Sequence, residues 1–117
     1  MNPVVLGALL AFTAVALGAF GSHALRETLP LERLATFETG VRYQMYHGLG
    51  LLALGALPRR TWRAAPLLFG GSLLFSGSLY LLVATGQNWW GAVAPLGGLL
   101  QLAGWGLLAY LSLRLGR

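Results

Sequence analysis

The sequence predicts an all-α, polytopic membrane protein built as a four-transmembrane-helix bundle. Of its 117 residues, 56% are hydrophobic and only 9% are charged, whereas about 25% of the residues of a soluble domain are charged. The apolar residues form long blocks, and a helix needs about 20 of them to cross a bilayer. Four blocks approach or exceed this length, at residues 3–25, 43–57, 64–85 and 89–113. A chain of this length forms one domain, so we expect a single transmembrane domain over residues 1–117.

The first helix is expected at about residues 3–24. No positively charged segment precedes its apolar run, so we interpret it as a retained helix and not as a cleaved signal peptide. Small residues recur along it at spacings of three and four, which places them on one face. Small residues let helix backbones approach closely in lipid. The expected packing residues of this helix are Gly7, Ala11, Ala14, Gly18 and Gly21.

A more polar connection follows and includes an interfacial segment at about residues 29–38. Pro30 is suited to start a helix, and the apolar residues Leu31, Leu34 and Phe37 recur every three residues. This spacing predicts a short amphipathic segment between the first two transmembrane helices. It either lies in the membrane interface or forms a polar first turn continuous with the second helix.

The second and third helices are expected at about residues 39–57 and 62–84. Pro58 and the arginines after it end the second helix, and glycines and serines are scattered around the third. The turn "TGQNWWG" then carries two adjacent tryptophans that suit the aromatic belt of a membrane interface.

The fourth helix is expected at about residues 89–113. Gly97, Gln101 and Gly104 share one of its faces, and we expect the two glycines to serve helix packing. Gln101 is expected either to hydrogen-bond across a helix interface or to line a small polar cavity. Glycine faces on the first and fourth helices also leave a homo-oligomer open.

The charges predict the orientation in the membrane. The net charge of +5 comes from eight basic residues, all of them arginine, against three glutamates. Four helices put both termini on one side, together with Arg59, Arg60, Arg63, Arg114 and Arg117, and leave Arg26, Arg33 and Arg42 on the other. The positive-inside rule then predicts a multi-pass protein of the cell inner membrane with both termini cytoplasmic. We interpret the arginines as topology signals and contacts to membrane lipids, not as a nucleic-acid surface.

The stretch "TGVRYQMYHGLGLL", residues 39–52, sets an unusual polar stripe beside an apolar run. Ionisable groups inside a membrane are costly and mark functional sites. His23 ends the first helix on the same side, so we expect it at a depth comparable to that of His47. The predicted polar cluster or ligand-binding site comprises His23, Thr39, Arg42, Tyr43, Gln44, Tyr46, His47, Ser76 and Tyr80.

Three functions remain open for this cluster. It can be a structural lock whose polar groups hydrogen-bond across helices. It can bind a small molecule, since two histidines at one depth suit a quinone carbonyl, a lipid headgroup or the two axial positions of a haem. A histidine proton relay for transport is the third. Exchange of protons at a buried carboxylate is disfavoured, because no acid lies within an apolar block.

Nothing in the sequence predicts an enzyme, a metal site or a cofactor. Cysteine and aspartate are absent, which removes thiol chemistry and the usual partner of a catalytic histidine. Ser76 belongs to "FSGSLY", which lacks the strand–turn–helix setting of a nucleophilic serine. We therefore expect a membrane protein that acts through lipid, helix-packing or partner contacts, with an unidentified small-molecule ligand as the alternative.

Four motifs in order resemble a known family. They are "ALGAFGSHAL" at 16–25, "TGVRYQMYHGLGLL" at 39–52, "LFSGSLY" at 74–80 and "PLGGLLQLAGW" at 95–105. Together they cover nearly the whole chain and resemble domain-of-unknown-function family 423, whose members include the eukaryotic transmembrane protein 256. The resemblance implies a four-helix integral membrane protein, of the inner membrane in bacteria, with no settled activity. The chain departs from the family pattern at Ala94, where threonine is usual, and at Gln101, where an apolar residue is usual.

Overall fold

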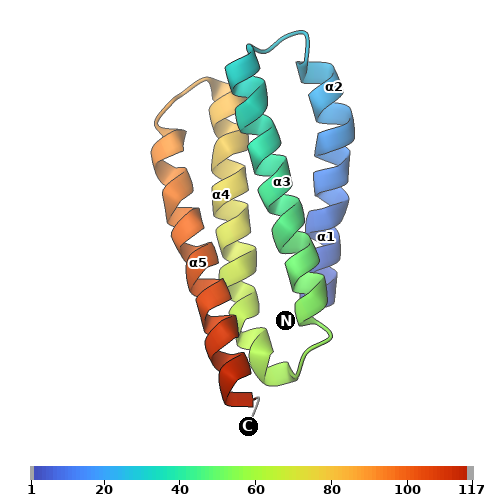
Figure 1. Cartoon of the computed structure of the whole chain (residues 1–117). Helices are drawn as coiled ribbons and strands as arrows, with labels where there is room; N and C mark the ends of the chain where they lie inside the picture. The colour runs from blue at the N-terminus through green and yellow to red at the C-terminus, as the bar shows by residue number, and fades with distance from the viewer. Residues whose placement is uncertain (1, 116–117) are drawn as a thin grey trace.

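The structure, a computed structural model, describes residues 2–115, which are helical with short connections and contain no strand. Its elements are α1 (Pro3–Ala16), η1 (Leu17–Gly21), α2 (Ser22–Leu25), α3 (Leu31–Leu54), η2 (Arg59–Ala64), α4 (Ala65–Thr85) and α5 (Trp90–Leu115). The first three follow one another without a break and form one rod (Figure 1). Asn2 caps the start of this rod, because its side-chain oxygen accepts from the Val4 N–H at 2.9 Å and Pro3 needs no such partner.

The interfacial segment expected at residues 29–38 is not a separate helix. Residues 31–38 are the first turns of α3, which runs unbroken from Leu31 to Leu54. Phe37 is buried against Gly21, and the Arg33 guanidinium donates to the Leu82 carbonyl at 3.1 Å. These contacts pack the polar turns against η1 and α4 and fit the second form expected for this segment, a first turn continuous with the helix.

Short connections reverse the chain between helices. The connection after α3 contains η2, a 3-10 helix in which the buried Thr61 hydroxyl donates to the Pro58 carbonyl at 2.6 Å. α4 ends at Thr85 and is capped by Gly86, whose φ of 72° is left-handed and therefore suits glycine. The Arg33 guanidinium also donates to the Gly86 carbonyl at 3.5 Å, which adds a partner for the end of α4.

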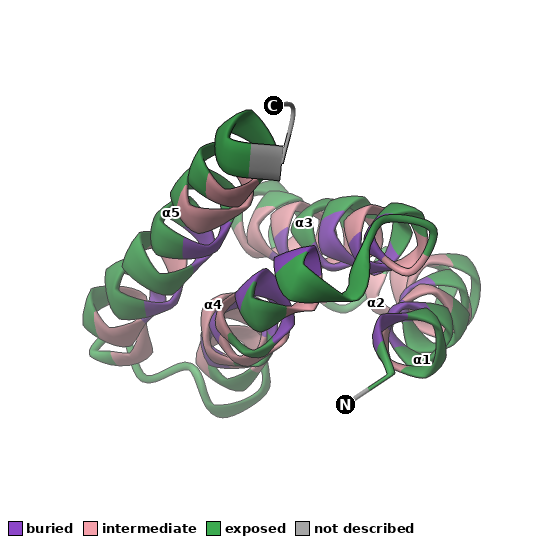
Figure 2. Cartoon of the chain, turned by 90° about the horizontal axis from the view of Figure 1, so that it is seen from below, coloured by how far each residue is buried: buried purple, intermediate pink, exposed green. Residues whose placement is uncertain are grey.

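The helices form a zigzag row instead of a closed bundle. α3 packs between α1 and α4, and α4 packs between α3 and α5. Viewed along the helices, α1 and α5 lie at the two ends of the row (Figure 2). The molecule measures 53 × 26 × 19 Å, so it is long and thin. This arrangement leaves one groove on each side of the row.

The apolar surface is consistent with a lipid environment. A small core of Leu10, Leu51, Leu54, Ala64, Ala65 and Leu68 lies where the helices meet, while large side chains such as Phe12 and Phe20 are more than 70% exposed. Within residues 2–115, three segments are long and apolar enough to cross a membrane: Pro3–Leu25, Arg59–Thr85 and Trp90–Arg114. α3 has 24 residues but carries four charged side chains in its first half.

Candidate functional site

Gln44, near the middle of α3, bridges three helices. Its amide nitrogen donates to the Leu10 carbonyl of α1 at 2.8 Å and also to the Thr13 hydroxyl. Its amide oxygen accepts from the Tyr80 hydroxyl of α4 at 2.7 Å. The side chain is only 5% exposed, and both of its polar atoms are used. Gln44 therefore ties α1, α3 and α4 together at one level.

His47, one turn farther along α3, connects to α5. Its Nδ1 lies 2.7 Å from the Tyr43 carbonyl, and its Nε2 lies 3.1 Å from the indole nitrogen of Trp105. A carbonyl only accepts and an indole N–H only donates. The ring is therefore neutral, with its proton on Nδ1. Both ring nitrogens are therefore used in hydrogen bonds within the protein.

Ser76 and Tyr80 of α4 complete the contact with α3. The Ser76 hydroxyl is buried and donates to the Gly40 carbonyl at 2.7 Å. A Cβ on Gly40 would lie 2.8 Å from the Tyr80 ring, so the glycine leaves room for the tyrosine that reaches Gln44. Ser76, Tyr80 and Gln44 thus form one polar network between α3 and α4.

The remaining polar residues of the stripe face outward. Tyr43 and Tyr46 are 40% and 54% exposed, and Tyr43 packs its ring 4.9 Å from that of Phe75. The Arg42 guanidinium is exposed and donates to the Thr39 hydroxyl at 3.3 Å. These residues line the surface beside the network and do not join it.

His23 lies far from His47. His47 lies near the level of Leu10 on α1, because its neighbour Gly48 packs against that residue. A Cβ on Gly48 would lie 3.2 Å from the Leu10 side chain. His23 is thirteen residues beyond Leu10 along the rod, or about 20 Å at roughly 1.5 Å per residue. It is also exposed. The expectation of two histidines at one depth therefore fails, because the sequence connection between them spans the turn and the polar first half of α3.

Small residues bring α1 and α3 into backbone contact. A Cβ on Gly7 would lie 2.5 Å from the Gly48 carbonyl oxygen. Gly18 faces Val41, Gly21 faces Phe37, and Ala14 is 1% exposed; a Cβ on Gly48 would lie 3.0 Å from the Ala11 nitrogen. α3 therefore covers this small-residue face of α1 and η1 within the monomer.

Glycines bring α4 and α5 together in the same way. A Cβ on Gly97 would lie 2.3 Å from the Phe75 nitrogen and 2.8 Å from the Gly71 carbonyl oxygen. Gly104 faces Leu68 and Leu67, where a Cβ would come within 2.7 Å of a leucine methyl. This face of α5 is covered by α4 within the monomer.

An open groove of about 500 Å³ lies between α3 and α5 over α4. We call it the α3–α5 groove. It is lined by Tyr43, His47, Phe75, Pro95, Gly98, Leu99, Gln101, Leu102 and Trp105. Its walls are mainly apolar and aromatic, which suits a lipid-soluble molecule. His47 and Trp105, joined by their hydrogen bond, form one wall.

Gln101 is the one groove residue whose buried polar nitrogen has no partner among the described residues. The side chain is 5% exposed, and its Nε2 makes no hydrogen bond. A Cβ on Gly71 would lie 2.9 Å from the Gln101 side chain, so α4 supports it from behind. An unpaired amide in an apolar setting is unfavourable by about 1–3 kcal/mol. Gln101 is expected either to hydrogen-bond across a helix interface or to line a cavity. Its position in the groove fits the second role.

A second, smaller groove of about 240 Å³ lies on the other side of the row, between α1 and α4. The Gln44 network forms part of its lining, and so does the buried Ser72 hydroxyl, which has no partner among the described residues. Residues 2–115 contain no group of three metal-ligating side chains placed to hold a metal ion.

The fold is that of an all-helical membrane protein, and comparison with known proteins agrees. Residues 17–98 match the family model described as protein of unknown function DUF423. The chain belongs to this family. No solved structure matches it.

Similar proteins occur in several bacteria. The chain is 46% identical to a UPF0382 membrane protein of Staphylococcus saprophyticus, over 90% of this chain and 91% of that protein. It is 43% identical to the UPF0382 membrane protein YwdK of Bacillus subtilis, over 87% and 88%. It is 39% identical to the UPF0382 inner membrane protein YgdD of Escherichia coli, over 97% and 91%. These names specify a membrane protein and no activity.

Proposed function

We propose that this chain is a four-span protein of the cell membrane that holds a carbonyl-bearing, lipid-soluble molecule in the α3–α5 groove and catalyses no reaction. The observation that carries the binding proposal is the buried Gln101 amide, whose nitrogen has no partner among the described residues. The Gln44 network and the His47–Trp105 pair act as structural locks that keep the groove in shape.

The position of α3 supports a fourth span. α3 is about 36 Å long at roughly 1.5 Å per residue, more than the ~30 Å of a hydrocarbon core. Gly55 near its end contacts Val4 of α1, and Gly40 in its first half contacts Tyr80 of α4. A helix enclosed between two membrane-crossing helices along this length crosses with them.

The distribution of arginine supports cytoplasmic termini. Arg59, Arg60 and Arg63 lie in η2, at the same end of the long axis of the molecule as Arg114 (Figure 1). At the other end, Arg33 is engaged with α4 and three glutamates dilute the charge. The positive-inside rule favours the η2 end as the cytoplasmic one.

Single cysteines test this topology, because the chain has none of its own. We expect Gln87→Cys, in the turn between α4 and α5, to react with a membrane-impermeant maleimide in spheroplasts. Ala56→Cys, in the connection after α3, should react only after the membrane is permeabilised. Labelling of both positions from the same side would rule out the four-span arrangement.

The groove defines the class of ligand. The Gln101 amide nitrogen is a donor and needs an acceptor such as a carbonyl oxygen. Around it, Tyr43, Phe75 and Trp105 offer aromatic surface to a flat ring or an acyl chain. A membrane molecule with a carbonyl on a hydrophobic body, such as a quinone or a lipid ester, satisfies both demands.

Native mass spectrometry of the protein in mild detergent tests the groove. We expect wild-type protein to carry a bound hydrophobic molecule, and Gln101→Leu to lose most of it while keeping its helical circular dichroism. Gln87→Leu removes an exposed amide in a turn and is the matched control, which should retain the molecule. A bare wild-type protein, or equal retention by Gln101→Leu, would refute the binding proposal.

A further inference from the structure

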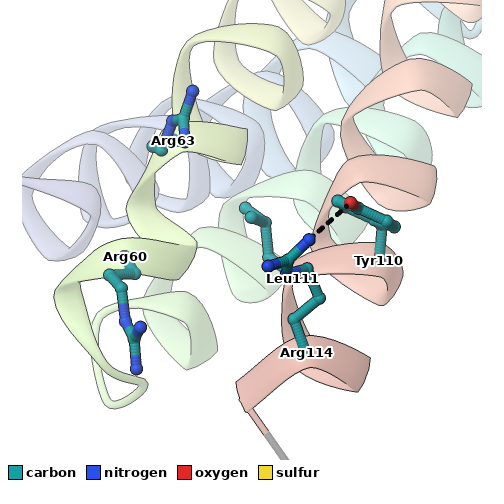
Figure 3. A pocket seen from close by; sticks show the side chains of 5 residues that line it. All are labelled: Arg60, Arg63, Tyr110, Leu111 and Arg114. Atoms are coloured by element: carbon teal, nitrogen blue, oxygen red, sulfur yellow. Dashed lines mark hydrogen bonds between the residues drawn. The ribbon is translucent and has the colours of Figure 1, made fainter.

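We propose that a hollow between η2 and the end of α5 binds a phosphate group, of the kind a membrane phospholipid presents. The hollow has a volume of about 330 Å³ and is lined by Arg60, Arg63, Tyr110, Leu111 and Arg114. Figure 3 shows Arg114 folded back toward Tyr110, with Arg60 and Arg63 on η2 across from it. This site lies apart from the α3–α5 groove, and none of its lining residues is shared with it.

The side chains of η2 lie on three faces of this short helix. In a 3-10 helix, residues three apart lie above one another. Thr61 and Ala64 form the face that is buried in the protein. Arg59 stacks on Trp62 with its guanidinium carbon 5.2 Å from the ring centre. This leaves Arg60 and Arg63 on the third face, toward the hollow.

Anchors keep η2 in this orientation. The Thr61 hydroxyl donates to the Pro58 carbonyl at 2.6 Å, and the Trp62 indole donates to the Leu57 carbonyl at 3.2 Å. Thr61 is only 1% exposed. The backbone that carries Arg60 and Arg63 is therefore fixed by the core, although both guanidinium groups remain solvated.

α5 contributes the opposite wall. The Arg114 guanidinium donates to the Tyr110 hydroxyl at 3.2 Å and lies 5.9 Å from the centre of its ring. Tyr110 thus holds Arg114 beside the hollow, and the guanidinium keeps further N–H groups to donate. Leu111 supplies an apolar patch. This combination of cations and apolar surface is typical of a lipid headgroup contact.

Within residues 2–115, the carboxylate side chains lie far from this hollow. The three glutamates of the chain, Glu27, Glu32 and Glu38, lie in or beside the first half of α3, at the opposite end of the long axis of the molecule (Figure 1). The positive charge of the three arginines that line the hollow is therefore available to an anion. Arginine guanidinium groups bind phosphate oxygens through paired N–H donors, so phosphate fits this site.

The test is a titration of the detergent-solubilised protein with dioleoylphosphatidylglycerol, with adducts counted by native mass spectrometry. We expect Arg114→Gln to weaken binding about fivefold, and Arg60→Gln with Arg63→Gln to weaken it about twenty-fivefold. Arg59→Gln removes the same charge at the same end but lies on the Trp62 face, and should change binding less than twofold.

The outcomes separate a built site from general charge attraction. Equal weakening by Arg59→Gln and Arg114→Gln, or unchanged binding in the hollow variants, would overturn the proposal. Competition with excess inorganic phosphate then identifies the source of the phosphate. Displacement of the lipid assigns free phosphate to the site, and retention assigns a lipid headgroup. Neither result depends on the topology or on the α3–α5 groove.

Discussion

Gly97→Ala is expected to force α5 away from α4 and to lower the free energy of unfolding by about 3 kcal/mol. A Cβ at this position would lie 2.3 Å from the Phe75 nitrogen and 2.7 Å from its Cα. These are backbone atoms, so no side-chain rotation relieves the clash and the helices themselves have to move. Reversible unfolding in mixed micelles with increasing dodecyl sulfate measures the loss.

Gly106→Ala is the matched control on the same helix. Nothing lies within 4 Å of a Cβ at Gly106, and alanine is a better helix former than glycine by up to about 1 kcal/mol. We therefore expect Gly106→Ala to leave stability unchanged or raise it. If Gly97→Ala and Gly106→Ala behave alike, close backbone contact between α4 and α5 is refuted.

Gln44→Leu is the second change with a large expected effect. It removes the bridge from α3 to Leu10 and Thr13 of α1 and to Tyr80 of α4. Hydrogen bonds between membrane helices contribute about 0.6–2 kcal/mol each, and the Tyr80 hydroxyl loses its acceptor. We expect the free energy of unfolding to fall by about 2–4 kcal/mol, measured by the same dodecyl sulfate titration.

Gln101→Leu provides the contrast to Gln44→Leu. Both side chains are 5% exposed, but the Gln101 nitrogen has no partner among the described residues. Leucine has a similar volume and leaves no unpaired amide. In lipid-free detergent, Gln101→Leu should therefore be as stable as wild type or more so. A loss as large as that of Gln44→Leu would contradict the assignment of Gln44 as a lock and Gln101 as a groove residue.

Much of the fold follows from the sequence, because membrane helices are set by the length of apolar blocks and by small residues on one face. The turns at Pro58 and Gly86 are local patterns of this kind, and so are the packing faces of α1 with Gly7 and of α5 with Gly97. The order in which the helices pack does not follow from the sequence: α1 and α5 occupy the ends of a row. The lengths of the helices do not specify which helix faces pack together. That packing depends on contacts between residues that are far apart in the sequence.

The candidate site was predicted in part. The polar stripe of α3 indicated Gln44 and His47 correctly as buried groups, since a polar residue inside an apolar block needs a partner. Their partners could not be deduced, because Trp105 is 58 residues from His47. The sequence predicts topology and lipid contacts for Arg33, whose guanidinium also donates to carbonyls at the end of α4. The depth of His23 cannot be deduced from the side of the membrane on which its helix ends, because α3 starts at Leu31, well before His47.

Thermal unfolding with and without added lipid tests most directly whether Gln101 serves a ligand. A ligand that binds only the folded state raises the melting temperature. After delipidation, we expect a bacterial membrane-lipid extract to raise the melting temperature of the wild type. Gln101→Leu should start at least as high and respond little. If the extract stabilises both proteins equally, or Gln101→Leu is already unstable without lipid, the Gln101 amide is a packing group and the groove has no ligand that depends on it.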